Sequence, residues 1–307
     1  MNDLKLNRFK FILTIAIILL TLSQCYTRRY SNEMKPFGRP ETPTGVVRVD
    51  TNNFYIDRYE ITNFNWAEYV YWVSKVYGHE SEIYKSVLPI KNLEESDNNC
   101  NEALGDYYYR HPYYQNYPVI GITQEQAKDY CIWRTNIVFQ FFLIREEVFD
   151  FPNQDSLDST NYFTVEKYFN GNFNGIEPDT NFMMYALYEL PAEQEWISSQ
   201  NFFLNTYMND DGNFALTDSV KIQFNKIAYC DSINKSVPTI NVTLNKKFNV
   251  ISHMYGNVAE WLKEDDKIIG GSWKDSVTTY FTNSTIQKKP STSVGFRCIC
   301  KWVKYSE

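Results

Sequence analysis

Apolar side chains recur at helical spacing in the segment that follows Thr62. They lie three or four positions apart, which places them on one face of an α-helix. The four residues are Trp66, Tyr69, Val70 and Val73. Threonine is a favoured N-cap because its side-chain oxygen accepts a hydrogen bond from a backbone N–H of the first turn. The pattern therefore predicts a helix that begins after Thr62 and buries this face.

Two further helices are predicted from the residues at their N-termini. Thr123 and Gln126 have the spacing of a capping box, in which each side chain bonds the backbone N–H of the other residue. We expect the helix that begins there to reach Phe142. A third helix is expected from Pro191 to Ser199, since proline is favoured in the first helical turn.

Most other segments combine short β-type runs with polar stretches. Aromatic residues make up 17% of the chain, and in a loop-rich domain their large side chains supply the apolar burial that long helices would otherwise give. Residues 80–116 and 153–180 are interpreted as surface excursions. The second segment places aromatic side chains among polar ones, which is typical of protein–protein interfaces. We therefore hypothesise that it carries partner contacts, the alternative being an insertion without a function.

An apolar run near the N-terminus predicts export. Residues 11–22 follow three basic residues, and the run is shorter than the roughly 20 residues of a membrane-spanning helix. Residues 22–25 resemble a lipobox, at which the chain is cleaved and Cys25 is acylated. An ordinary signal peptide with an unrelated cysteine is the alternative. The predicted organisation is a signal peptide at 1–24, a lipidated N-terminus and tether at 25–45, and one domain at 46–304.

Charge argues against a nucleic-acid partner. The formal net charge is -7, and Lys and Arg are dispersed along the chain, whereas binding to phosphate backbones needs a concentrated positive surface. The three histidines have no spacing typical of zinc ligands. Residues 264–266 are acidic and are interpreted as a solvated turn.

Three blocks near the end of the chain carry the most specific pattern. They read Gly-Asn-Val-Ala-Glu-Trp at 256–261, Gly-Gly-Ser-Trp at 270–273 and Gly-Phe-Arg-Cys at 295–298. Earlier blocks are Phe-Tyr-Ile-Asp-Arg-Tyr-Glu at 54–60, Tyr-Cys-Ile-Trp at 130–133 and Leu-Pro-Ala-Glu-Gln-Glu-Trp at 190–196. In this order they resemble the formylglycine-generating enzyme, or sulfatase-modifying factor, superfamily. The resemblance implies an irregular, loop-rich α+β fold with few helices and short strands, related to C-type lectins. Ala192 replaces the family's threonine, which removes a helix cap worth about 1 kcal/mol.

An insertion indicates which members of the superfamily the chain resembles most. Residues 134–189 separate two blocks that lie close together in typical members, and Lys274 and Asp275 follow Gly-Gly-Ser-Trp. Both features resemble the gliding-motility and type IX secretion lipoproteins of Bacteroidota. That resemblance implies lipid anchoring at the periplasmic face of the outer membrane. It also implies periplasmic protein partners of a secretion or motility complex, assembled as an oligomeric ring. A periplasmic or secreted protein is the alternative.

The resemblance also implies that catalysis has been lost. The family's two copper-binding cysteines align with Asp275 and Tyr280, just after Ser272 and Trp273. Cu(I) prefers soft thiolate ligands, so neither a carboxylate nor a phenol replaces a cysteine at this task. The expectation is a non-enzymatic domain with no required cofactor. The alternative is another enzymatic or ligand-binding role.

A structural calcium ion is a further implication of the resemblance. Family members bind calcium at the Gly-Asn-Val-x-Glu-Trp loop through carbonyl oxygens and the glutamate. The corresponding residues here are Gly256, Asn257, Val258 and Glu260. Calcium accepts six to eight oxygen ligands at loosely defined angles, which a loop can supply. The alternative is that Glu260 is a buried carboxylate bonded to backbone amides.

The family pairs the cysteine of its Tyr-Cys-x-Trp block with that of Gly-Phe-Arg-Cys. The resemblance therefore implies a disulfide between Cys131 and Cys298, with two buried thiols as the alternative. Disulfides persist outside the cytoplasm, which agrees with the predicted export. The pairing of Cys100, Cys230 and Cys300 stays open.

Overall fold

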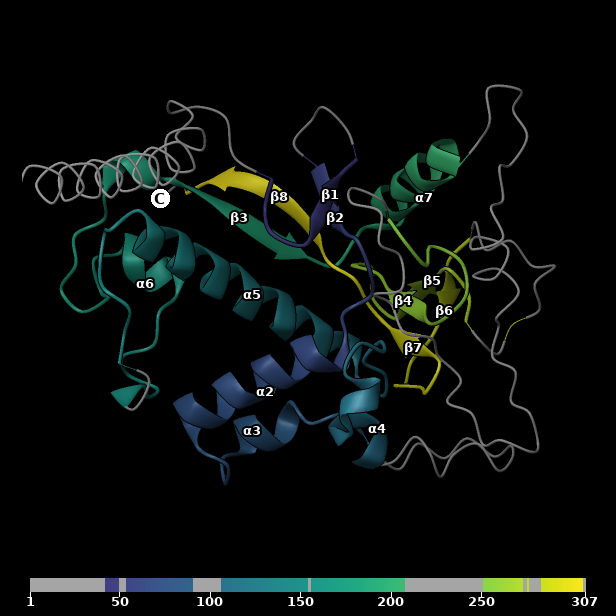
Figure 1. The fold of residues 1–307 in the computed structure, drawn as a ribbon, viewed down its shortest axis with the longest axis horizontal. Helices are drawn as coiled ribbons and strands as arrows, with labels where there is room; N and C mark the ends of the chain where they lie inside the picture. Colours follow the sequence, from purple (N-terminus) through teal and green to yellow (C-terminus); the bar gives the residue numbers. More distant parts are fainter. Residues whose placement is uncertain are drawn as a thin grey trace, which may run out of the picture. The chain divides into compact units, whose positions relative to one another are not determined.

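A computed structural model describes residues 42–49, 54–90, 106–153, 156–207, 251–272, 275 and 283–305. The chain from Thr42 onward forms one compact unit, and Figure 1 shows how its elements are arranged. Some of the expected features lie outside the described residues: the signal peptide, Cys25, Cys100, Cys230, Trp273, Lys274 and Tyr280. Within the described ranges, no helix is long and apolar enough to cross a membrane.

The first sheet of the described residues has the strand order β1-β2-β8-β3, with every pair antiparallel. Its strands are β1 Val46–Arg48, β2 Phe54–Asp57, β3 Met184–Glu189 and β8 Ile299–Lys304. Strand β8 lies between β2 and β3, which are far apart in the sequence (Figure 1). Alternate side chains of a strand point to opposite faces, so Cys300 packs in one core cluster and its neighbour Ile299 in another.

The second described sheet has the order β6-β5-β4-β7. Its strands are β4 Ala259–Trp261, β5 Lys267–Ile269, β6 Thr285–Ile286 and β7 Val294–Gly295. Strands β4 and β5 are antiparallel, whereas β4 and β7 are parallel. At Gly295 an added Cβ would lie 2.8 Å from the carbonyl oxygen of Val119, so only glycine allows this approach. The sheet thus brings the blocks at 256–261 and 295–298 side by side.

One long helix packs on the first sheet, and a second packs on that helix. Helix α5, Gln124–Arg145, packs against β3, and helix α2, Asn63–Tyr77, packs against α5 (Figure 1). Helix α5 begins at the predicted capping box of Thr123 and Gln126, and α2 begins at the predicted N-cap Thr62, which forms a capping box with Asn65. The predicted starts are confirmed, and α5 continues past its expected end at Phe142 by almost one turn.

The other described helices are short: α3 Glu82–Ser86, α4 Asp106–Arg110, η2 Pro112–Tyr114, α6 Val165–Phe169 and η4 Thr180–Phe182. Helix α7, Glu193–Tyr207, is the exception, and it continues well beyond the expected end at Ser199. Few helices and short strands joined by long loops confirm the α+β class expected from the sequence.

Helix α7 begins without the side-chain cap that the family's threonine would provide. Half of a capping box remains, because Glu195 Oε2 accepts a hydrogen bond from the Ala192 N–H at 2.9 Å. The Glu193 N–H donates to both carboxylate oxygens of Glu264, at 3.1 and 3.2 Å. The turn at 264–266 is therefore more than a solvated turn, since Glu264 replaces part of the missing cap from a distant position.

The described residues of the insertion between α5 and β3 fold back on α5 and build a core with it. Its buried side chains are Phe139, Leu143, Phe163, Val165, Tyr168 and Phe173. The hypothesis that aromatic residues of 153–180 face a partner is therefore wrong for Phe163, Tyr168 and Phe173. In residues 80–116, expected at the surface, Tyr108 is also fully buried. An aromatic-among-polar composition suits a small core with polar turns as well as an interface, so composition alone could not separate the two.

Candidate functional site

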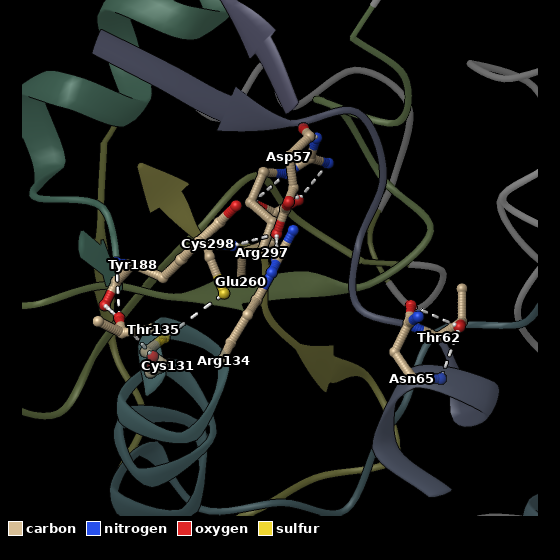
Figure 2. Close-up of polar contacts among 10 residues, drawn as sticks. All are labelled: Asp57, Thr62, Asn65, Cys131, Arg134, Thr135, Tyr188, Glu260, Arg297 and Cys298. Carbon is tan, nitrogen blue, oxygen red and sulfur yellow. Dashed lines mark hydrogen bonds and ion pairs between the residues drawn. The ribbon is translucent and has the colours of Figure 1, made fainter. Parts of the chain in front are cut away.

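Arg297 is the centre of a buried polar cluster beneath the motif blocks. Its side chain is fully buried, and its Nε donates to both carboxylate oxygens of Glu260, each at 2.8 Å. The Nη1 donates to the backbone oxygen of Asp57 at 3.2 Å, and Nη2 donates to those of Ser252 and His253 at 3.0 Å. Figure 2 shows Arg297 beside Glu260 and Asp57. One side chain thus joins the end of β2, the 252–253 segment and β4.

Glu260 has a second donor in Trp196, whose Nε1 lies 2.7 Å from its Oε2. Trp196 comes from α7, so this bond connects the block at 190–196 to the block at 256–261. Gly270 lies against the same indole: an added Cβ would be 3.0 Å from the ring, and its φ of +97° favours glycine. Burial raises the pKa of Glu260, although Arg297 opposes this effect.

Glu60 is a second buried carboxylate near the same guanidinium. Its Oε1 accepts a hydrogen bond from Asn257 Nδ2 at 2.9 Å, and its Oε2 lies 3.9 Å from Arg297 Nη2. Within the described residues, Oε2 has no hydrogen-bond donor. Burial raises the pKa of Glu60 to about 7, against the lowering effect of Arg297. One guanidinium therefore lies near two carboxylates, and burial favours the protonated form of Glu60.

His253 is buried next to this cluster in a left-handed conformation, with a φ of 59°. Burial, and then the charge of Arg297, lowers its pKa to about 3. The imidazole is therefore neutral across the physiological range, which removes it as a proton donor at neutral pH.

A second ion pair lies between α5 and the first sheet. Arg134 Nη1 donates to Asp57 Oδ2 at 2.7 Å, and the same oxygen accepts from the Cys298 N–H at 2.8 Å (Figure 2). The guanidinium of Arg134 also stacks over the ring of Tyr188, 4.2 Å from its centroid. Charge-assisted hydrogen bonds of this kind are stronger than neutral ones and fix the position of α5 on the sheet.

Cys131 and Cys298 are brought into contact by this arrangement. Their Sγ atoms are 3.5 Å apart, beyond the about 2.05 Å of a disulfide bond, and both are free thiols in the structure. Burial, and then the neighbouring Cys131 thiol, raises the pKa of Cys298 well above its usual range. The proximity implied by the resemblance is present, and the disulfide itself stays a prediction.

Asp275, aligned with one of the family's catalytic cysteines, closes a turn. Its Oδ2 accepts hydrogen bonds from the N–H and the hydroxyl of Ser272, at 2.7 and 2.8 Å. Its own N–H donates to the Ser272 oxygen at 3.1 Å. Because Trp273 and Tyr280 lie outside the described residues, the rest of the degenerate site stays a prediction.

The expected calcium ligands fit a cation only in part. Both oxygens of Glu260 accept from Arg297, and the side-chain amide of Asn257 donates to Glu60. Glu260 therefore does not fit as a calcium ligand in this arrangement. The backbone contributions of Gly256 and Val258 stay predictions.

Comparison with known proteins agrees with this fold and these blocks. The family model of the sulfatase-modifying factor enzyme 1-like domain matches residues 24–302. The chain therefore belongs to the sulfatase-modifying factor family of formylglycine-generating-enzyme-like domains. No curated protein matches the chain.

Two solved structures are similar to the chain. Variable protein 1 of Treponema denticola is 14% identical, with a TM-score of 0.38, and the match covers 86% of this chain and 93% of that one. CarF is 15% identical, with a TM-score of 0.34, covering 81% of this chain and 86% of that one. At this level of identity the similarity concerns the fold alone.

Sequence reasoning missed the polar cluster around Arg297 and the pair formed by Arg134 and Asp57. Asp57, Glu60 and Arg297 stand inside motif blocks whose other residues are largely apolar. A charged residue in such a block is buried with its neighbours and needs a partner of opposite charge. That signal was present in the sequence, although it did not indicate which charges would pair.

Proposed function

We propose that this protein is a non-catalytic, lipid-anchored member of the family, and a structural component or paralogue of the gliding-motility and type IX secretion machinery. The observation that carries the proposal is the turn between Ser272 and Asp275. A thiolate at that position would have to remain available to bind Cu(I). The Asp275 carboxylate instead accepts two hydrogen bonds from Ser272, one from the backbone N–H and one from the hydroxyl, and so stabilises the local turn.

The insertion at 134–189 supports a structural role. Its buried aromatic side chains pack on α5, so the insertion adds an ordered body to the domain. Tyr162 also stacks edge to face on Trp72 of α2, with ring centroids 5.4 Å apart. A pre-organised surface loses little conformational entropy when a partner binds, which suits a component of a permanent assembly. The partners would be periplasmic proteins of the complex, arranged with this chain as a ring.

Attachment to the outer membrane would come from acylation of Cys25. Each buried methylene of an acyl chain contributes about 0.8 kcal/mol, so several chains on one cysteine give lasting anchoring. A Cys25→Ala variant should move from the membrane fraction to the soluble periplasmic fraction. An unchanged membrane fraction would mean that the anchor lies elsewhere.

Partner capture tests the assembly. The tagged protein is extracted from membranes with mild detergent, and the co-purifying proteins are identified by mass spectrometry. Components of the secretion or motility complex are expected, whereas a preparation that recovers sulfatases and no secretion component would contradict the proposal. The Cys25→Ala variant is the matched control, because it keeps the domain and loses only the anchor.

An activity assay tests the loss of catalysis separately. The purified domain is incubated with Cu(I), oxygen and a peptide that carries a sulfatase motif, beside a control with metal alone. No conversion of the peptide cysteine above the control is expected. Turnover would favour the alternative of an enzymatic domain.

A further inference from the structure

Helix α2 carries a stripe of exposed side chains along its outer face. Its buried residues face the domain, where α2 packs against α5 and α3 (Figure 1). The exposed residues of the helix lie three or four positions apart and are Phe64, Ala67, Glu68, Tyr71 and Lys75. With 3.6 residues per turn, this spacing places all of them on one side of the helix. The stripe therefore runs along most of the length of α2.

Large aromatic side chains dominate the stripe. Phe64 is 53% exposed and Tyr71 is 59% exposed, and the small side chain of Ala67 lies between them. Aromatic residues are enriched where proteins bind one another, and tyrosine is frequent among the residues that carry most of the binding energy. Anchors at positions i, i+3 and i+7 are typical of a helix that packs its outer face on a partner. The stripe thus has the composition and the spacing of an interface.

The two charges of the stripe indicate what covers it. We propose that the outer face of α2 pairs two copies of this chain about a two-fold axis. In a symmetric interface the same patch meets itself, so any charge on it has to be matched by the opposite charge on that patch. Glu68 and Lys75 supply both signs, seven residues or about 10.5 Å apart along the helix. In the part of the chain that the structure describes, neither forms an ion pair.

Antiparallel pairing of the two helices matches these charges. With the two-fold axis between residues 71 and 72, Glu68 of each copy lies opposite Lys75 of the other, which gives two ion pairs. The two Tyr71 rings then meet at the axis, and Phe64 lies about 11 Å from it, near the end of the contact. Lys75 already lies along the stripe, because its Nζ is 5.6 Å from the centroid of the Tyr71 ring. Parallel pairing would place like charges opposite each other.

A second pair of exposed aromatic residues lacks this self-complementary charge. Phe141 and Phe151 are 52% and 55% exposed, and their ring centroids are 5.8 Å apart. The exposed charged residues that precede Phe151 most closely are Glu147 and Asp150, both acidic. Two copies that met at this pair would bring like charges together. Phe151 is therefore a suitable control position for the face of α2.

Sedimentation equilibrium of the full chain in a density-matched detergent measures the pairing directly. The wild type should dimerise reversibly, with a Kd that rises with ionic strength because salt screens the two ion pairs. Tyr71→Ala should raise the Kd about tenfold or more, since it removes a central ring from both copies at once. Phe151→Ala removes an aromatic side chain of similar exposure and should leave the Kd unchanged. A wild type that stays monomeric up to near-millimolar concentration would overturn the proposal, as would equal effects of the two substitutions.

Exchanging the charges tests the antiparallel arrangement by a gain of binding. Glu68→Lys and Lys75→Glu should each weaken the homodimer, because each turns both ion pairs into repulsive pairs. The two positions are exposed, so the substitutions leave the core of the domain intact. The double variant should recover the wild-type Kd, and an equimolar mixture of the two single variants should form mixed dimers in preference to either homodimer. Mixed dimers no more stable than the homodimers of the single variants would overturn the proposal. The proposal does not depend on the role in secretion or motility.

Discussion

The core of the insertion allows a direct test of whether residues 134–189 belong to the cooperative fold. Phe163 is 2% exposed, and its ring lies within 6.1 Å of those of Phe139, Phe149, Tyr168 and Phe173. Replacing it with alanine removes most of a buried side chain and leaves a cavity. Large-to-small substitutions of this kind cost about 3–5 kcal/mol.

Phe151 provides the matched control, because it lies in the same insertion and carries the same side chain. It is 55% exposed, and its described ring contact is with Phe141, which is itself 52% exposed. A Phe151→Ala change should therefore cost about 0.5 kcal/mol or less, as is usual for surface positions. The difference between the two variants measures the burial and not the loss of a phenyl group as such.

Urea denaturation followed by tryptophan fluorescence is the assay, with the free energy of unfolding and the slope m fitted for each protein. If the insertion unfolds with the rest of the domain, Phe163→Ala shifts the midpoint and leaves m unchanged. A loss for Phe163→Ala no larger than that for Phe151→Ala would refute the reasoning. A separate early transition in the wild type would show that the insertion melts on its own.

Three other outcomes are expected. The pKa of His253 is lowered to about 3 from 6.5, so the unfolded state binds more protons between these values, and stability falls with acidification by up to about 1.4 kcal/mol per pH unit. The pKa of Glu60 is raised to about 7 from 4.5, so protonation of Glu60 stabilises the folded state as the pH falls and opposes the effect of His253. A His253→Asn variant should therefore become more stable from pH 7 to 5, while the stability of the wild type changes less. Parallel pH profiles of the two proteins would contradict this. Ala192→Thr should complete the capping box of α7 and add about 1 kcal/mol to the free energy of unfolding, measured by thermal unfolding. Ala192→Val should not, because valine has the shape of threonine but lacks the hydroxyl. Non-reducing peptide mapping of protein from the periplasm should recover Cys131 linked to Cys298, and finding both as free thiols would rule out the predicted bond.

The local features of this fold were predictable, because they depend on residues close together in the sequence. Thr123 and Gln126 are three positions apart, and their capping box forms as expected. The cap that Glu264 gives to α7 joins residues 71 positions apart, and no local pattern indicates it. The pair of Arg134 and Asp57 is likewise 77 positions apart.

The candidate site could likewise be predicted only in part. The motif blocks identified the residues of the cluster, since Glu260 and Arg297 stand within them. The role of Glu260 was not predictable, because a carboxylate can equally serve a metal ion, backbone amides or a guanidinium. Only the three-dimensional arrangement shows that Arg297 is its partner.

The position of β8 between β2 and β3 has a consequence for the time at which the domain can fold. Both neighbours precede β8 in the chain, and neither pairs with the other in the described residues. Because synthesis starts at the N-terminus, the first sheet cannot close until β8 has been made. Until then β2 and β3 keep unpaired edges, which other chains can bind. The first sheet is therefore completed only after residues 299–304 are available, and its unpaired edges favour aggregation until then.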